Sequence, residues 1–131
     1  MIKVTGGLIQ SSGKFLVARR GPNESSPGLW EFPGGKLEDD ETLEECIQRE
    51  LTEELGIYSK IGKLYFQYEY HYNKISFDLY FFKVNSYEGN ICLSVHDELK
   101  WIRVDDIDKR IFLPGDGPLI NKLAKEQPMW F

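Results

Sequence analysis

The stretch GKLEDDETLEECIQRELTEELGI, which runs from Gly35 to Ile57, is the most informative part of the sequence. Loop-forming residues give way to strong helix formers near its middle. Asp39, Asp40 and Thr42 are typical residues just before the start of a helix, and Gly56 is a typical residue just past its end. The pattern therefore predicts a helix from Glu41 to Leu55.

Three glutamates of this helix, Glu50, Glu53 and Glu54, share one side, because residues three and four apart are neighbours on a helix. At about 100° per residue they border the apolar stripe of the helix. That stripe consists of Leu43, Ile47, Leu51 and Leu55. Carboxylates beside a packed face are partly desolvated and favour a compensating cation. A magnesium site is one interpretation, since Mg²⁺ prefers oxygen ligands. A solvated acidic face is the other.

Arg49 directly precedes Glu50 and also has two interpretations. It orients one of the carboxylates through a charge-assisted hydrogen bond, or it is an ordinary exposed helix arginine. The spacing alone does not choose between them.

The whole segment resembles the Nudix box. The box pattern is Gly, five residues, Glu, seven residues, Arg-Glu, an aliphatic residue, any residue, Glu-Glu, any residue, Gly and an aliphatic residue. Its fixed positions hold Gly35, Glu41, Arg49, Glu50, Leu51, Glu53, Glu54, Gly56 and Ile57. The preceding run, from Gly28 to Lys36, resembles the approach to the box in MutT-type members of the family.

The other elements fit a mixed α+β fold. Strands are expected at residues 2–10 and 14–20 as a hairpin, at 29–32, at 58–72 and 75–84 as a second hairpin, and at 99–104. The run Pro33-Gly34-Gly35 should stop the short strand before it. Helical segments are expected at 105–109 and 118–126, and loops at 21–28, 85–97 and 111–118. The resemblance implies the Nudix fold, an α/β/α sandwich with a mixed β-sheet, in a single domain of residues 1–131.

The resemblance also implies a hydrolase. Glu50, Glu53 and Glu54 would bind Mg²⁺, or Mn²⁺ in its place, with the carbonyl of Gly35 as a further ligand. The metal would lower the pKa of a water that attacks the β-phosphorus of a nucleoside triphosphate, and the products would be a monophosphate and pyrophosphate. Positioning by Arg49 and electrostatics would supply most of the rate.

The general base stays open between Glu50 and a residue of a later loop. Some family members use a glutamate from that loop, but Val95 stands at the corresponding place here. Two interpretations remain for the neighbouring residues: they take the place of the loop glutamate as the general base, or they are ordinary surface residues. These residues are His96, Asp97 and Glu98.

Several residues are candidates for substrate binding by resemblance. Arg20, rather than Arg19, is expected to contact phosphate, although an ordinary strand-end arginine is an equal alternative. Trp30 is a stacking platform for the base or a core residue. The further candidates for substrate contact are Lys36, Phe77, Leu79 and Asp116.

Asp116 stands where MutT-type enzymes read an oxidised guanine with an asparagine. An ionised aspartate only accepts hydrogen bonds, whereas asparagine donates as well, so the readout should differ. The leading substrate is an oxidised nucleotide such as 8-oxo-dGTP, with a role in sanitation of the nucleotide pool. The alternatives are CTP or a modified dCTP, another nucleoside diphosphate derivative, or a non-catalytic nucleotide sensor.

Composition restricts the partners. The length of 131 residues suits one domain, and the net charge of −5 disfavours binding of polymeric nucleic acid or of a membrane surface. The start MIKVTGGLIQ has no signal-peptide pattern, so a cytoplasmic location is expected, with a monomeric or homodimeric state. Cys46 and Cys92 lack metal-binding spacing and are expected to be core thiols.

Overall fold

The computed structural model describes residues 1–130, and the chain divides into two compact units. The first unit consists of residues 1–8 and 33–94. The second consists of residues 9–32 and the chain from Val95 onward. Each unit contains β-strands and one α-helix, so the mixed α+β class expected from the sequence is confirmed.

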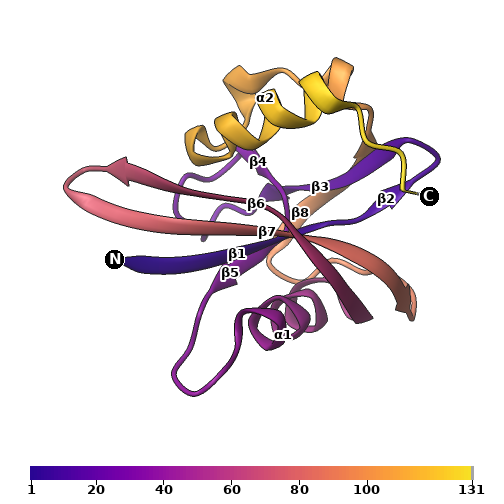
Figure 1. Ribbon diagram of the computed structural model, residues 1–131, viewed down its shortest axis with the longest axis horizontal. Coiled ribbons are helices and arrows are strands. Elements are labelled where there is room, and N and C mark those ends of the chain that lie inside the picture. The colour runs from indigo at the N-terminus through magenta and orange to yellow at the C-terminus, as the bar shows by residue number, and fades with distance from the viewer. Residues whose placement is uncertain (131) are drawn as a thin grey trace. The chain divides into compact units, whose positions relative to one another are not determined.

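The first unit contains a four-stranded mixed sheet in the order β5-β1-β7-β6 (Figure 1). Its strands are β1 (Ile2–Leu8), β5 (Gly34–Lys36), β6 (Tyr58–Tyr72) and β7 (Ile75–Glu88). β1 and β7 run parallel, and the other neighbours are antiparallel. The mixed sheet and the hairpin of β6 and β7 are therefore confirmed.

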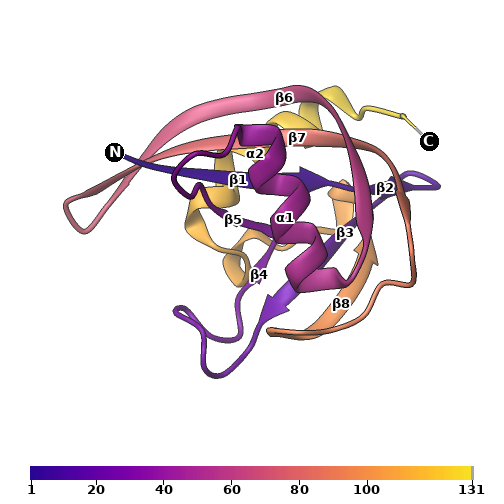
Figure 2. The same cartoon turned by 90° about the horizontal axis from the view of Figure 1, so that it is seen from below.

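Helix α1 (Leu43–Leu55) packs against this sheet, as Figure 2 shows. Its first turn is closed by a capping box: the Thr42 hydroxyl accepts a hydrogen bond from the Glu45 amide, and the Glu45 carboxylate accepts one from the Thr42 amide. Gly56 ends the helix with φ 71°, a left-handed conformation that favours glycine. The buried residues of α1 are Cys46, Ile47, Leu51 and Leu55, whereas Leu43 is only half-buried.

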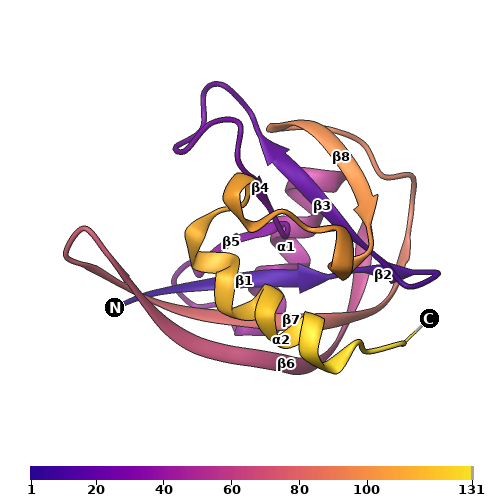
Figure 3. The ribbon, with the colours of Figure 1, turned by 90° about the horizontal axis from the view of Figure 1, so that it is seen from above.

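The second unit is an antiparallel sheet built around β3, together with α2 (Figure 3). Its strands are β2 (Gln10–Ser11), β3 (Lys14–Arg20), β4 (Trp30–Glu31) and β8 (His96–Ile102). Three short 3₁₀-helices, η1 (Val104–Asp106), η2 (Lys109–Ile111) and η3 (Pro114–Asp116), lead to α2 (Gly117–Glu126). The Gln10 side chain donates to the carbonyl of Pro128 and accepts from the amide of Trp130, which ties the chain end to β2.

The expected first hairpin is confirmed only next to its turn, where Gln10 and Ser11 pair with β3. The strand is interrupted at Ile9, and the residues before it form β1, which pairs with β5 and β7 instead of β3. The chain passes from one unit to the other at this point. The sequence from Ile2 to Gln10 contains no residue pattern that indicates this passage.

The short strand β4 ends before Pro33, as expected, but the interruption is brief, because Gly34 already begins strand β5. A Cβ atom on residue 34 would lie 2.0 Å from the carbonyl oxygen of Thr5 on β1. Glycine is therefore needed here for the close approach of two strands and not for a turn.

Other boundaries differ by a few residues. α1 begins at Leu43 because Thr42 is its cap, β7 continues to Glu88, and β8 begins at His96. Cys46 is buried as expected, but the expectation for Cys92 is wrong, since this residue is exposed. No helix of residues 1–130 is long and apolar enough to cross a membrane.

Candidate functional site

In the first unit, Arg49 is the centre of a network of carboxylates. Its Nη1 donates to Oε1 of Glu50 at 2.8 Å and to Oε2 of Glu53 at 3.2 Å. Its Nη2 and Nε donate to the two carboxylate oxygens of Glu41 at 2.8 and 3.1 Å. Nη2 also donates to the backbone carbonyl of Lys36 at 3.1 Å. This geometry favours the interpretation in which Arg49 orients carboxylates through charge-assisted hydrogen bonds.

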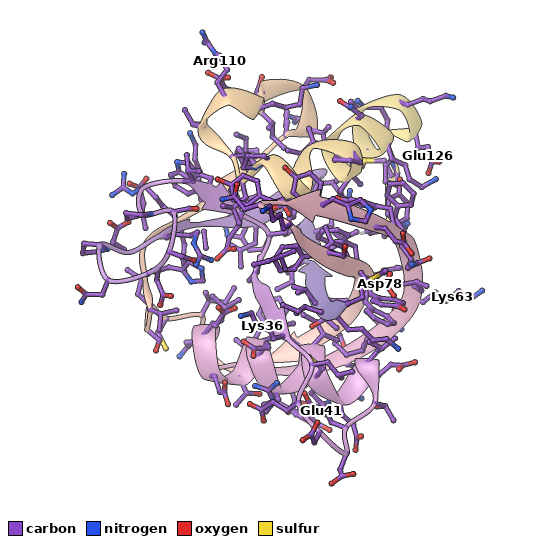
Figure 4. The ribbon with its side chains drawn as sticks, turned by 90° about the vertical axis from the view of Figure 1, so that its left-hand side faces the viewer. Lys36, Glu41, Lys63, Asp78, Arg110 and Glu126 are labelled. Carbon is purple, nitrogen blue, oxygen red and sulfur yellow. The ribbon has the colours of Figure 1, made fainter. Side chains whose placement is uncertain are left out.

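Glu41 and Lys36 come from segments outside the helix (Figure 4). Glu41 lies just before α1, and Lys36 is the last residue of β5, with an exposed side chain. The hydrogen bonds from Arg49 hold the pKa of Glu41 down, at about 2, and the pKa of Arg49 is raised in turn. Arg49 is therefore a fixed cation that joins the loop, the strand and the helix.

Two glutamates of α1 contact Arg49, and Glu50 is the more buried of the two. Its side chain is 15% exposed, compared with 59% for Glu53. Burial raises the pKa of Glu50, although Arg49 acts in the opposite direction. The carboxylate lies against the Cα atom of Gly35, where any side chain would collide with it. A partly desolvated carboxylate in this position gains from a nearby cation.

Glu54, half-buried, completes the group by accepting a hydrogen bond from the amide of Gly34 at 3.0 Å. The three carboxylates of Glu41, Glu50 and Glu53 share the one guanidinium group of Arg49, so negative charge is in excess even before Glu54 is counted. All of the available ligand atoms are oxygens. This donor set fits a hard divalent cation such as Mg²⁺ and would not suit a soft metal.

The carbonyl oxygen of Gly35, expected as a further metal ligand, already has two donors within the unit. The Thr5 hydroxyl donates to it at 3.3 Å, and the Cys46 thiol lies at 3.7 Å. A carbonyl oxygen has two lone pairs, so a metal ion would bind here beside one of these donors.

In the second unit, Arg20 forms a buried ion pair that sequence analysis missed. Its Nη1 donates to both carboxylate oxygens of Glu31, at 2.9 and 3.0 Å. Nε2 of His96 lies within hydrogen-bond distance of Oε2 of Glu31, at 2.8 Å. Within residues 1–130 the other ring nitrogen of His96, Nδ1, has no hydrogen-bond partner. The sequence does offer one indication of this pair, because Glu31 is the one charged residue within the apolar run from Leu29 to Phe32.

Asp116 lies in the same unit and is buried, with 8% of its surface exposed. Its Oδ2 accepts a hydrogen bond from the amide of Phe32 at 3.2 Å. Burial, and next the charge of Glu31, raise the pKa of Asp116 to about 7. Burial therefore favours the protonated form of Asp116, in which the carboxyl group can donate a hydrogen bond as well as accept one.

Trp30 and Arg19 lie side by side on paired strands. Trp30 belongs to the buried core, 8% exposed, and the Arg19 guanidinium is 5.8 Å from the centre of its ring. Arg19 also pairs with Asp97 at 2.6 Å and with Glu98 at 3.2 Å. Asp97 and Glu98, which were expected in a loop, thus lie in β8 and form ion pairs with an arginine.

The structure distributes the expected site residues over both units. The first unit brings together Gly35, Lys36, Arg49, Glu50, Glu53 and Glu54. It also contains Phe77, half-buried on β7 beside Ile2 of β1. The second unit contains Arg20, Trp30 and Asp116.

Comparison with known proteins gives concordant matches. The family model described as the NUDIX domain matches residues 3–123. A CTP pyrophosphohydrolase of Escherichia coli is 32% identical, with 92% of this chain and 90% of the relative covered. An 8-oxo-dGTP diphosphatase of Haemophilus influenzae is 34% identical, with 96% and 93% covered. Among solved structures, the E. coli ORF135 protein superposes with a TM-score of 0.85 at 31% identity, with 98% and 94% covered.

Proposed function

The chain belongs to the Nudix hydrolase family, and from this premise we propose that it is a Mg²⁺-dependent pyrophosphohydrolase of nucleoside triphosphates. The reaction converts a nucleoside triphosphate and water into a nucleoside monophosphate and pyrophosphate. The observation that carries the proposal is the cluster around Arg49, in which the carboxylates of Glu41, Glu53 and a partly desolvated Glu50 exceed the one guanidinium charge.

Glu50, Glu53 and Glu54 are the proposed ligands of the metal, and Mn²⁺ is an acceptable substitute for Mg²⁺. The Gly35 carbonyl is a further proposed ligand, and its second lone pair lets it keep the Thr5 hydroxyl as a donor. When bound, a divalent cation neutralises charge on the phosphate oxygens and lowers the pKa of water. Arg49 holds the Glu50 and Glu53 carboxylates in place through hydrogen bonds of 2.8 and 3.2 Å.

Glu50 is also the proposed general base. Burial raises the pKa of its carboxylate, which makes it a stronger proton acceptor than an exposed glutamate. The other candidates for the general base lie in β8 and already have partners. His96 is hydrogen-bonded to Glu31, and Arg19 forms ion pairs with Asp97 and Glu98. These contacts favour the glutamate of the box.

For the substrate, we propose an oxidised purine nucleotide such as 8-oxo-dGTP, because relatives that match over most of the chain carry the name 8-oxo-dGTP diphosphatase. CTP or a modified dCTP is the second candidate. It is favoured by the relative named CTP pyrophosphohydrolase and by Asp116, whose ionised form would accept from the amino group of cytosine. The proposed substrate contacts are Arg20, Trp30, Lys36, Phe77 and Asp116.

We further propose that both units act together as a single Nudix domain, residues 1–131. The support is the family match, which runs from residue 3 to residue 123 and so includes parts of both units. The cytoplasmic location and the monomeric or homodimeric state stay predictions.

The test is a panel of 8-oxo-dGTP, dGTP, CTP, 5-methyl-dCTP and ADP-ribose, incubated with the protein and Mg²⁺. Pyrophosphate and monophosphate are quantified for the wild type and for Glu53→Gln. We expect release of both products from at least one triphosphate and a loss of about 100-fold or more in the variant. Cleavage of ADP-ribose alone would move the assignment to another diphosphate substrate. Inactivity on the whole panel would favour a nucleotide sensor.

A further inference from the structure

Thr5 lies directly opposite Gly35, the first residue of the box, in the antiparallel pair of β1 and β5. Its side chain is 2% exposed, so the hydroxyl has been removed from water. The hydroxyl donates to the Gly35 carbonyl oxygen at 3.3 Å. The hydroxyl thus adds a side-chain hydrogen bond to the backbone pairing of the two residues, and this bond favours one orientation of the Gly35 carbonyl.

Cys46 supports the same carbonyl from the side of the helix. It is fully buried, its Sγ lies 3.2 Å from the Thr5 hydroxyl, and it is 3.7 Å from the Gly35 oxygen. A cysteine thiol is a weak hydrogen-bond donor. Nη2 of Arg49 lies 3.8 Å from the same sulfur. Thr5 is thus in contact with both segments that carry the carboxylate network.

The other side of Gly35 faces Glu50. A Cβ atom on residue 35 would lie 2.4 Å from the carboxylate carbon of Glu50, so the glycine backbone forms one wall of the space that this carboxylate occupies. A rotation of the Gly35 peptide would change that wall. The direction of the Gly35 carbonyl and the place of the Glu50 carboxylate are therefore linked through a single residue.

We propose that Thr5 is a positioning residue for Glu50: its hydroxyl fixes the Gly35 peptide so that the open face of the glycine receives the Glu50 carboxylate. Thr5 lies outside the box and acts through Gly35 and Cys46. The inference rests on the proposed function, because Glu50 is there a metal ligand and the general base.

Two substitutions distinguish the contribution of the Thr5 hydroxyl from that of the size of the side chain. Thr5→Val keeps the shape and removes the donor, and Thr5→Ser keeps the donor and removes a methyl group. The affinity for Mn²⁺ is measured without nucleotide, by electron paramagnetic resonance of the free ion. kcat and KM are measured on the best substrate of the panel, and unfolding in urea shows that each variant is folded.

We expect Thr5→Val to bind Mn²⁺ about 10-fold more weakly and to lose about 10-fold in kcat with KM nearly unchanged, the size of effect typical of groups that orient metal ligands. Thr5→Ser should stay within about twofold of the wild type, since it keeps the hydroxyl. If Thr5→Val does not fold, Thr5→Ala, which also lacks the donor and introduces no new bulk, is measured in its place.

Wild-type values for Thr5→Val would overturn the inference, and so would equal losses in Thr5→Val and Thr5→Ser, because both would show that the hydroxyl has no special role. A wild type that neither binds Mn²⁺ nor hydrolyses any nucleotide would instead overturn the proposed function, and the inference with it. The two failures are therefore distinguishable.

Discussion

Gly35 and Glu50 are in such close contact that a Cβ atom on residue 35 would lie 2.4 Å from the carboxylate carbon and 2.5 and 2.6 Å from the two oxygens of Glu50. A side chain at residue 35 would displace this carboxylate from its present place, in which it accepts a hydrogen bond from Arg49 at 2.8 Å. The glycine that opens the box is thus explained by a contact with a residue fifteen positions later.

Replacement of Gly35 by alanine should displace Glu50 and reduce kcat by about 100-fold, because a misplaced catalytic group loses most of its effect. Activity and Mn²⁺ affinity are measured together with circular dichroism. The matched control is Gly117→Ala at the start of α2, where an added Cβ atom would have no neighbour within 4 Å. Normal activity in Gly35→Ala would mean that the position of Glu50 does not matter.

Replacement of Arg49 by lysine keeps the positive charge but removes the planar fork that joins Glu41, Glu50 and Glu53. We expect kcat to fall by about 10- to 100-fold, since the carboxylates are no longer held in one arrangement. Steady-state kinetics at saturating Mg²⁺ measure the effect. A change in KM alone would contradict an orienting role for Arg49.

Arg20 is proposed to contact a phosphate group, and its neighbour Arg19 provides the comparison. Arg20→Gln should raise KM by about 10-fold, because one charge-assisted contact with phosphate is lost. Arg19→Gln removes exposed pairs with Asp97 and Glu98 and should leave KM nearly unchanged. Equal effects of the two substitutions on KM would argue against the assignment of phosphate binding to Arg20.

Asp116 makes stability depend on pH. Its pKa is raised from 3.8 to about 7 in the folded protein, so the folded state holds this proton more tightly than the unfolded chain. The stabilising contribution is fully present at low pH, is lost as the pH rises from about 4 to about 7, and is constant above that. Relative to Asp116→Asn, which does not titrate, the wild type should lose up to about 4 kcal/mol of unfolding free energy over this range.

Urea unfolding of both proteins at a series of pH values measures this difference. A difference that does not change between about pH 4 and about pH 7 would show that Asp116 titrates normally. The same titration should alter the choice of base, since the protonated and ionised forms offer different hydrogen-bond patterns.

The parts that sequence predicts well are those encoded by neighbours along the chain. The helix of the box follows from Thr42, Gly56 and the spacing of its apolar residues, and it begins and ends within two residues of the prediction. The hairpin of β6 and β7 is encoded in the same local way.

The features that sequence did not predict depend on residues far apart in the chain. The bond between His96 and Glu31 spans 65 residues, and the bond between Asp116 and the amide of Phe32 spans 84. The raised pKa of Asp116 arises from burial that no local pattern encodes. The interruption of the first strand at Ile9 likewise depends on which partner strands each half finds.

The most direct test of the proposed reaction follows one nucleoside triphosphate by ³¹P nuclear magnetic resonance, with Mg²⁺ and with a chelator in its place. We expect the monophosphate and pyrophosphate to appear together in equal amounts with Mg²⁺, and no change of the substrate with the chelator or in the Glu53→Gln variant. Formation of a diphosphate and inorganic phosphate, or the same rate without a divalent metal, would contradict a Mg²⁺-dependent pyrophosphohydrolase.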